Sequence, residues 1–240
     1  MRPFAAGVLS SLCLLAAAAR CAAATEAWGG SLAVTSDYIV RGISRSDDRA
    51  ALQLDVHYLN ASGFVAGIFA SNAQIDAGES RDVEFDAFAG FAWAAGEDWR
   101  GRFLLSHYAY LWNRLGSGYD YDELDVDLGY RDWLDVSVVY SPNSPLYMPD
   151  RGLVGVASES AEVNLQRPLA RKLSASAGIG YSHFEGPYPE GYAYWSIGAA
   201  YDLAPVSLIL SYVGATAGAR TLFYNAAEGG RLTGTVIWRF

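Results

Sequence analysis

The residues of this sequence that point most clearly to a chemistry are carboxylates that alternate with apolar side chains. In residues 82–93, Glu84 and Asp86 alternate with Phe85 and Ala87. Because successive side chains of a β-strand point to opposite faces, this segment would have one acidic and one apolar face. An acidic face can attract cations, pair with arginines or line a polar passage.

The same alternation places acids and arginines from several segments on one side, which we expect to be the lumen of a barrel. The candidate lumen and selectivity residues are Asp37, Arg41, Asp55, Glu84, Asp86, Arg100, Arg102, Glu123, Asp125, Asp127, Asp135 and Glu162. Acids outnumber arginines in this set, so arginine pairs or water must relieve their mutual repulsion. A lumen filled by an ion-pair network and a narrow water-filled passage that disfavours anions both stay open, and we favour the passage.

Catalytic side chains are scarce, since His57, His107 and His183 are the only histidines. Ser106 and His107 are neighbours, and in a strand they would point to opposite faces, which prevents a dyad between them. We therefore expect no enzyme. An outer-membrane barrel enzyme that acts on lipids stays as an alternative, and it would require an outward-facing Ser/His/acid set.

We expect no cofactor and no metal site. The histidines are widely spaced, and the acids alternate along strands instead of forming a compact loop. Gly178-Ile179-Gly180 lacks the strand–turn–helix context of a nucleotide site. Asp47-Asp48 could touch divalent cations that bridge lipopolysaccharide, although a solvated charge pair is the simpler interpretation.

The elements that position these residues are about twelve strands, each near the length that a tilted membrane strand needs. They are residues 31–41, 52–58, 64–72, 82–93, 99–110, 123–130, 133–141, 159–166, 172–183, 192–202, 205–213 and 231–240. Twelve strands of this kind predict an all-β fold, an antiparallel up-and-down transmembrane barrel.

The connections alternate in length, as expected of a barrel with both termini in the periplasm. The long ones are 42–50, 73–81, 111–120, 142–158, 184–191 and 214–230, and the short ones are 60–63, 94–98, 131–132, 167–171 and 203–204. Pro142, Pro145 and Pro149 argue against an ordinary strand in residues 142–158, and the sequence leaves open whether this loop folds inward.

Residues 1–24 have the order of a secretory signal peptide, with Arg2, an apolar run over 7–19 and a small-residue end. The apolar run has 13 residues, fewer than a spanning helix needs. Cys13 and Cys21 both fall in this segment, so we expect residues 25–240 to form the barrel without disulfides.

Residues 232–240 alternate up to a C-terminal aromatic, Phe240, as the last strand of an outer-membrane barrel does. Tryptophans near strand ends predict aromatic girdles: Trp93, Trp99, Trp133, Trp195 and Trp238.

We expect an exported protein of the bacterial outer membrane. Its expected partners are membrane lipid, lipopolysaccharide and the barrel-assembly machinery. That machinery would bind the strand that ends in Phe240. A water-soluble lipocalin-like or sandwich protein, with its apolar face inside, is the alternative fold.

Charge excludes nucleic acid as an expected partner. Residues 1–24 contain two of the 17 Lys and Arg residues and no acid, so 15 basic residues face 26 acidic ones in the remainder. A surface with this excess of negative charge repels phosphate backbones.

The first predicted hairpin carries Ser36-Asp37-Tyr38 and Arg41-Gly42-Ile43-Ser44, followed by Gly63-Phe64, Ser71-Asn72 and Tyr140-Ser141-Pro142-Asn143. This pattern resembles the proteobacterial family of TorF-type porins, whose members share an S-D-Y-x-x-R-G-x-S opening. The resemblance implies a porin in the outer membrane and leaves its solutes undefined. Independently of it, Asp37 and Arg41 are four apart and would share a face of a strand, with Gly42 turning the chain into the outer loop.

Together, these features predict a porin-like channel for passive diffusion of small polar or cationic solutes. The lipid-acting barrel enzyme and a plugged structural barrel stay as alternatives.

Overall fold

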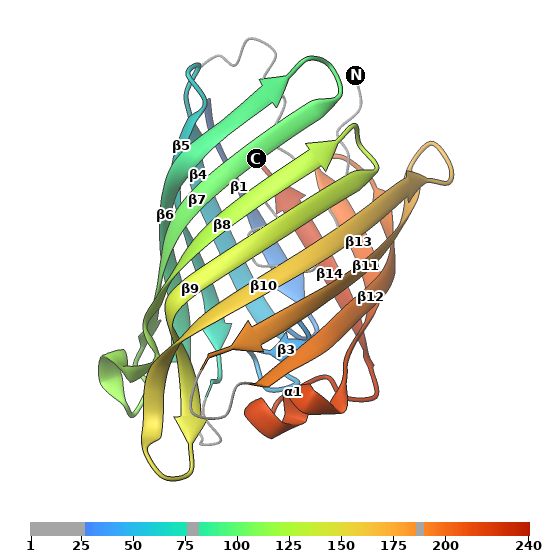
Figure 1. Ribbon diagram of the computed structural model, residues 1–240. Coiled ribbons are helices and arrows are strands. Elements are labelled where there is room, and N and C mark those ends of the chain that lie inside the picture. The colour runs from blue at the N-terminus through green and yellow to red at the C-terminus, as the bar shows by residue number, and fades with distance from the viewer. Residues whose placement is uncertain (1–26, 76–81, 186–189) are drawn as a thin grey trace.

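The computed structural model describes residues 27–75, 82–185 and 190–240. The predicted signal peptide, with both cysteines, lies outside the described residues. Twelve strands form a closed barrel (Figure 1). They are β1 (Ala27–Thr35), β4 (Ala51–Leu59), β5 (Phe64–Ala73), β6 (Asp82–Ala95), β7 (Trp99–Leu111), β8 (Tyr121–Tyr130), β9 (Leu134–Met148), β10 (Gly152–Pro168), β11 (Leu173–Phe184), β12 (Glu190–Asp202), β13 (Val206–Ala215) and β14 (Arg231–Arg239).

Each strand pairs antiparallel with its neighbours in sequence, and β1 closes the barrel by pairing with both β4 and β14. Val34 on β1, for example, lies opposite Leu52 on one side and Val236 on the other. Closure leaves no open edge along the barrel wall, which is the condition for a sheet surrounded by lipid. The predicted fold class and strand number are therefore confirmed.

The apolar faces point outward and the carboxylates point inward. On β8, Leu124 and Val126 are each 37% exposed, whereas Glu123 and Asp125 are 3% and 5% exposed. A water-soluble barrel would need the reverse arrangement, because its apolar face must be buried. The sequence prediction that apolar side chains point outward and carboxylates point inward is therefore confirmed on this strand.

Aromatic side chains gather at both ends of the outer wall. At the end with the short turns, Trp99 packs on Tyr130 with 4.8 Å between ring centroids, and Trp238 packs on Phe240 at 5.2 Å. At the other end, Trp195 packs on Tyr212 at 5.3 Å. Rings of this kind are typical of the two membrane–water interfaces of a barrel.

Residues 36–50, named here the lumenal loop, differ from the prediction. β1 ends at Thr35, and the loop folds back inside the barrel around a small hairpin of β2 (Ile39–Val40) and β3 (Ile43–Ser44). Arg41 and Gly42 form its two-residue turn with φ values of 49° and 77°, as a type I′ hairpin turn requires. The expectation that Asp37 and Arg41 share the face of a strand is therefore wrong.

The predicted outer loop 142–158 is also wrong, because most of it continues β9 and β10 as a hairpin that projects beyond the barrel (Figure 1). Pairing of β9 with β8 ends at Tyr140, whereas its pairing with β10 continues through Pro145, opposite Gly155. Pro142 and Pro145 thus lie where β9 has lost one neighbour. At such an edge, a missing N–H leaves no ladder bond broken.

Two short helical segments lie in the long connections: η2 (Gly116–Tyr119), a 3-10 helix, and α1 (Ala217–Leu222). α1 and the β2–β3 hairpin lie at the end opposite the C-terminus (Figure 1). Among the described residues, neither helix has the length and apolar character needed to cross a membrane.

Candidate functional site: the lumen and its loop

The lumenal loop crosses the barrel and contacts opposite walls. Asp37, Ser44 and Ser46 of the loop are less than 9% exposed. On one side Tyr38 packs against Phe69 of β5, with 6.1 Å between ring centroids. A connecting segment carries polar backbone, so its burial requires partners inside the lumen.

Arg41 supplies one of these partners. Its guanidinium donates two hydrogen bonds to Glu123 of β8, from Nη1 to Oε1 at 2.7 Å and from Nη2 to Oε2 at 3.0 Å. Asp125 is 4.0 Å from the same Nη2. A bidentate pair fixes orientation as well as distance, so it holds the hairpin turn against the acidic wall.

Glu84 anchors the loop from a second strand. The Tyr38 hydroxyl donates to Glu84 Oε1 at 2.5 Å, and the Tyr110 hydroxyl donates to Oε2. Arg45 Nη1 in turn donates to the Tyr110 hydroxyl at 3.2 Å, and Nη2 donates to that of Tyr121 at 3.4 Å. Glu84 is 1% exposed, so this network is formed without solvent access.

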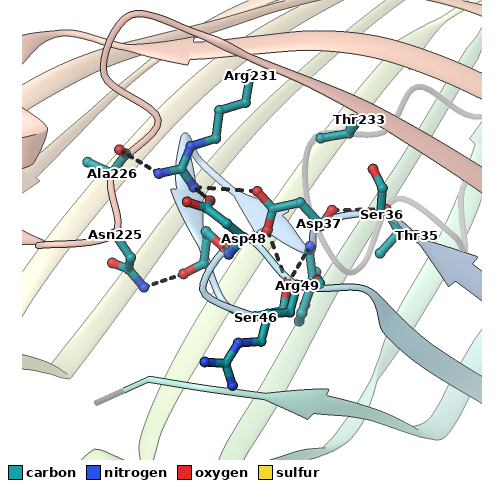
Figure 2. Close-up of polar contacts among 12 residues, drawn as sticks. Thr35, Ser36, Asp37, Ser46, Asp48, Arg49, Asn225, Ala226, Arg231 and Thr233 are labelled. Atoms are coloured by element: carbon teal, nitrogen blue, oxygen red, sulfur yellow. Dashed lines mark hydrogen bonds and ion pairs between the residues drawn. The ribbon is translucent and has the colours of Figure 1, made fainter. Parts of the chain in front are cut away.

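The loop is also tied to β14 and to the last long connection (Figure 2). Asp37 accepts hydrogen bonds from the hydroxyls of Ser44 at 2.5 Å and Ser46 at 3.1 Å, and from Arg231 Nη1 at 3.4 Å. Burial raises the pKa of the Asp37 carboxyl, and these hydrogen bonds and the charge of Arg231 oppose the rise. Arg231 also pairs with Asp48.

Backbone pairing strengthens this second attachment. The Ser44 amide donates to the Asn225 carbonyl at 3.1 Å, Ile43 forms a bridge with Ala226, and the Ala227 amide donates to the Gly42 carbonyl at 2.8 Å. The lumenal loop is therefore bonded to the wall on one side and to the last connection on the other.

Negative charge remains in excess around the loop. Glu84, Asp86, Glu123 and Asp125 face Arg41 and Arg45. Asp86 Oδ1, Asp125 Oδ2 and Ser106 Oγ are buried without a hydrogen-bond partner in the described part of the chain. Where carboxyl groups that outnumber guanidinium groups are ionised, they attract cations and repel anions.

Between the lumenal loop and the short turns, ion pairs lie along the inner wall. Arg102 Nη2 and Nε lie 2.6 and 3.0 Å from Asp127 Oδ2. Arg100 Nη2 lies 2.6 Å from Asp135 Oδ1. These side chains are partly exposed, so this end of the lumen is accessible to solvent.

The wall opposite the acids is built from small hydroxyl side chains. On β11 to β14 the inward residues include Ser174, Ser196, Ser207, Ser211, Thr233 and Thr235. A cavity of about 40 Å³ lies between Arg41 and Arg45 of the loop and the inward serines Ser160 and Ser182. Apolar side chains such as Leu104, Phe88 and Ile237 are also buried inside the barrel, so the inner surface combines polar groups with apolar clusters.

The structure places the predicted lumen residues in two groups. The first group lies at the lumenal loop, with Arg41 on the loop itself and four acids on the wall beside it: Glu84, Asp86, Glu123 and Asp125. The second group forms the ion pairs nearer the short turns: Arg100, Arg102, Asp127 and Asp135.

The remaining predicted residues have other hydrogen-bond partners. Asp55 pairs with His57 Nδ1 at 2.7 Å, and Glu162 accepts a hydrogen bond from Asn164. Asp37 lies on the loop, not on a strand.

Sequence reasoning missed Arg45 and the tyrosines. Tyr110 has the same parity as Arg100 and Arg102 on β7, and Tyr121 has the same parity as Glu123 and Asp125 on β8, so their inward position was readable from the alternation. Arg45 lay in a segment predicted as an outer loop, which gave no indication of burial.

A lipase-like site finds no support in the orientation of its candidate residues. Ser106 is buried on the inner face, whereas His107 is exposed on the outer face and bonds Asp122. Among the described residues, no three His, Cys, Asp or Glu side chains converge in a way that could hold a metal ion.

A family model matches residues 19–240, that of a bacterial protein of unknown function, Gcw_chp. The chain belongs to this family. No curated protein matches this Gcw_chp chain.

Solved structures similar to the Gcw_chp chain include two porins and an outer-membrane channel. The NanC porin has a TM-score of 0.54 and 10% identity, over 88% of this chain and 98% of that one. The KdgM porin has a TM-score of 0.53 and 10% identity, over 88% and 99%. An outer-membrane channel from Pseudomonas putida has a TM-score of 0.52 and 11% identity, over 90% and 96%. At these identities the likeness shows a shared barrel fold.

Proposed function

We propose that this Gcw_chp protein is an outer-membrane, porin-like channel for passive diffusion of small polar or cationic solutes. The lumenal loop is the constriction of its path. The fold shared with NanC, KdgM and the Pseudomonas putida channel supports this proposal, as does the resemblance of residues 36–44 to TorF-type porins.

The observation that carries the proposal is the acidic excess at the constriction. Asp86 and Asp125 lack partners for one carboxylate oxygen each, whereas the guanidinium of Arg41 is fully engaged by Glu123. A solute that passes this level meets more carboxyl groups than guanidinium groups, and each ionised carboxylate lowers the barrier for cations and raises it for anions. The KdgM porin has been solved with oligogalacturonate, a polyanion, and the acidic constriction of this chain favours a different solute class.

A plugged structural barrel is the second candidate, and one observation favours it. The lumenal loop is bonded to β6, β8 and β14, and a cavity of about 40 Å³ lies beside it. In our proposal conduction requires the loop to shift, and a loop that never shifts would make the barrel a structural protein.

Insertion is expected to depend on the last strand. Phe240 exchanges backbone hydrogen bonds of 3.1 Å with Gly30 at the point where β14 closes against β1. We propose that the barrel-assembly machinery recognises this strand through its aromatic end.

Single-channel recording of the purified protein in planar bilayers tests the proposal. A pore gives discrete current steps after insertion, and a plugged barrel gives a silent membrane although the protein is inserted and folded. The lipid-acting enzyme would be silent and would release fatty acid from the bilayer lipid.

A further inference from the structure

The cavity beside the lumenal loop is lined by charged and hydroxyl side chains. Arg41 and Arg45 of the loop lie on one side of it, and inward residues of β8 to β12 lie on the other. Its volume is about 40 Å³. Since one water needs about 10 to 15 Å³, the cavity has room for about three waters or for one chemical group of similar size.

The charged side chains of this lining leave one positive charge over. Glu123 is the carboxylate among the described lining residues, and both of its oxygens accept hydrogen bonds from Arg41. That pair is balanced, which leaves the guanidinium of Arg45. The hydrogen bonds of Arg45 go to neutral hydroxyls, one of which, that of Tyr110, donates in turn to Glu84. A cation placed in this way favours a ligand with negative charge.

Arg45 also has unused hydrogen-bond donors. Its Nη1 and Nη2 donate to the hydroxyls of Tyr110 and Tyr121 at 3.2 and 3.4 Å, which are long distances for an N–H···O bond. A guanidinium has five N–H groups, so these two bonds leave three. Nε is buried without a partner among the described residues. An unbonded buried donor costs free energy, and a bound acceptor removes that cost.

The opposite side of the cavity supplies hydroxyl donors. Ser144 and Ser158 share one hydrogen bond at 2.6 Å, and Ser160 and Ser182 share another at 2.8 Å. Ser182 also bonds the hydroxyl of Tyr192. Two hydroxyls joined by one bond, or three joined by two, keep one O–H that is not used within the set. Each set therefore has one donor left for a ligand in the cavity.

Aromatic rings bound the same space. Phe184 of β11 and Phe223 of the last connection line the cavity, and their rings pack with 5.4 Å between centroids. A charged contact is stronger where apolar groups keep water away. The cavity therefore combines a cation, spare hydroxyl donors and a partly apolar boundary, which is the composition of a site for a small organic anion.

We propose that this cavity binds a small carboxylate, held by Arg45 and by the serine hydroxyls of β9 to β11. The planar fork of a guanidinium matches the two oxygens of a carboxylate. Asp86 and Asp125, on which the proposed cation preference rests, do not line the cavity. The inference goes beyond the proposed function, and a binding assay tests it without any current.

The test measures the NMR line width of acetate labelled with ¹³C at its carboxyl carbon, in the presence of purified barrel in detergent. R45Q removes the charge, and S160A/S182A removes two hydroxyls and keeps the charge. R49Q is the matched control, because Arg49 is an exposed arginine of the same loop that does not line the cavity. Labelled acetamide, which has the shape of acetate without its charge, replaces acetate in a parallel sample. Far-UV circular dichroism checks that each variant is folded.

We expect wild type and R49Q to broaden the acetate signal equally, R45Q to bind acetate about tenfold more weakly and S160A/S182A to bind it several-fold more weakly. The acetamide signal should stay sharp. Equal broadening of acetate by wild type and R45Q, or of acetamide and acetate by the wild type, would overturn the inference. If R45Q does not fold, S160A/S182A decides, and acetate binding equal to that of the wild type overturns the inference. D86N/D125N, which tests the proposed cation preference, should bind acetate as the wild type does, so the two proposals fail separately.

Discussion

Arg41 and Glu123 are 82 residues apart in sequence and form a two-bond ion pair inside the lumen, at 2.7 and 3.0 Å. The pair joins the turn of the lumenal loop to the acidic wall. Glu123 is 3% exposed, so loss of either partner leaves a charge in a poorly solvated place.

R41Q should therefore destabilise the barrel by about 3 kcal/mol, the lower end of the cost of breaking a buried pair. The measurement is urea unfolding in lipid vesicles, followed by tryptophan fluorescence. R41Q/E123Q should recover part of the loss, because it removes both charges. Identical midpoints for wild type and R41Q would show that the pair contributes nothing to stability.

Y110F should cost about 1 to 3 kcal/mol, because it removes the hydroxyl that bonds Glu84 Oε2 and Arg45 Nη1 in a buried place. Y108F is the matched control. The ring of Tyr108 stacks on Tyr121 at 4.4 Å, and its hydroxyl forms no hydrogen bond within the described part of the chain. The same unfolding assay should show a small change for Y108F, and equal losses in the two variants would contradict the network at Glu84.

A disulfide should lock the lumenal loop. Ile43 and Ala226 form a bridge across the loop and the last connection, and Cys13 and Cys21 lie in the predicted signal peptide. In I43C/A226C, oxidation should abolish the current steps and reduction should restore them. Single-channel recordings that are the same before and after reduction would mean that solutes bypass the loop.

The stability of the loop attachment should depend on pH through Asp37. Its pKa is raised in the folded protein, so between 3.8 and that raised pKa the folded state holds more protons than the unfolded chain. Stability from this group is therefore full below 3.8 and falls as the pH rises through the window. Urea midpoints of D37N and wild type across acidic pH should diverge in this direction, and parallel curves would contradict it.

The barrel wall was predictable because its pattern is local. Glu123, Leu124 and Asp125 alternate in the sequence, and lipid outside with charge inside follows directly from that alternation. The proline-containing hairpin was missed because prolines break central strands, whereas Pro142 and Pro145 lie on a strand with one neighbour.

The lumenal loop could not be predicted, because its partners are distant in sequence. Ile39 and Val40 read as a continuation of the first strand, and only contacts with Glu84, Asn225 and Arg231 place this segment inside the lumen. The alternation therefore predicted which faces of the strands carry the acids, and it did not predict the loop that packs against them.

The reversal potential under a KCl gradient tests the central claim most directly, because it measures the sign of charge that the constriction admits. We predict a cation-selective potential for the wild type, reduced toward zero in D86N/D125N and unchanged in D98N, whose carboxylate lies in an exposed turn 2.9 Å from Arg131. An anion-selective wild type, or a potential that D86N/D125N leaves unchanged, would contradict the account.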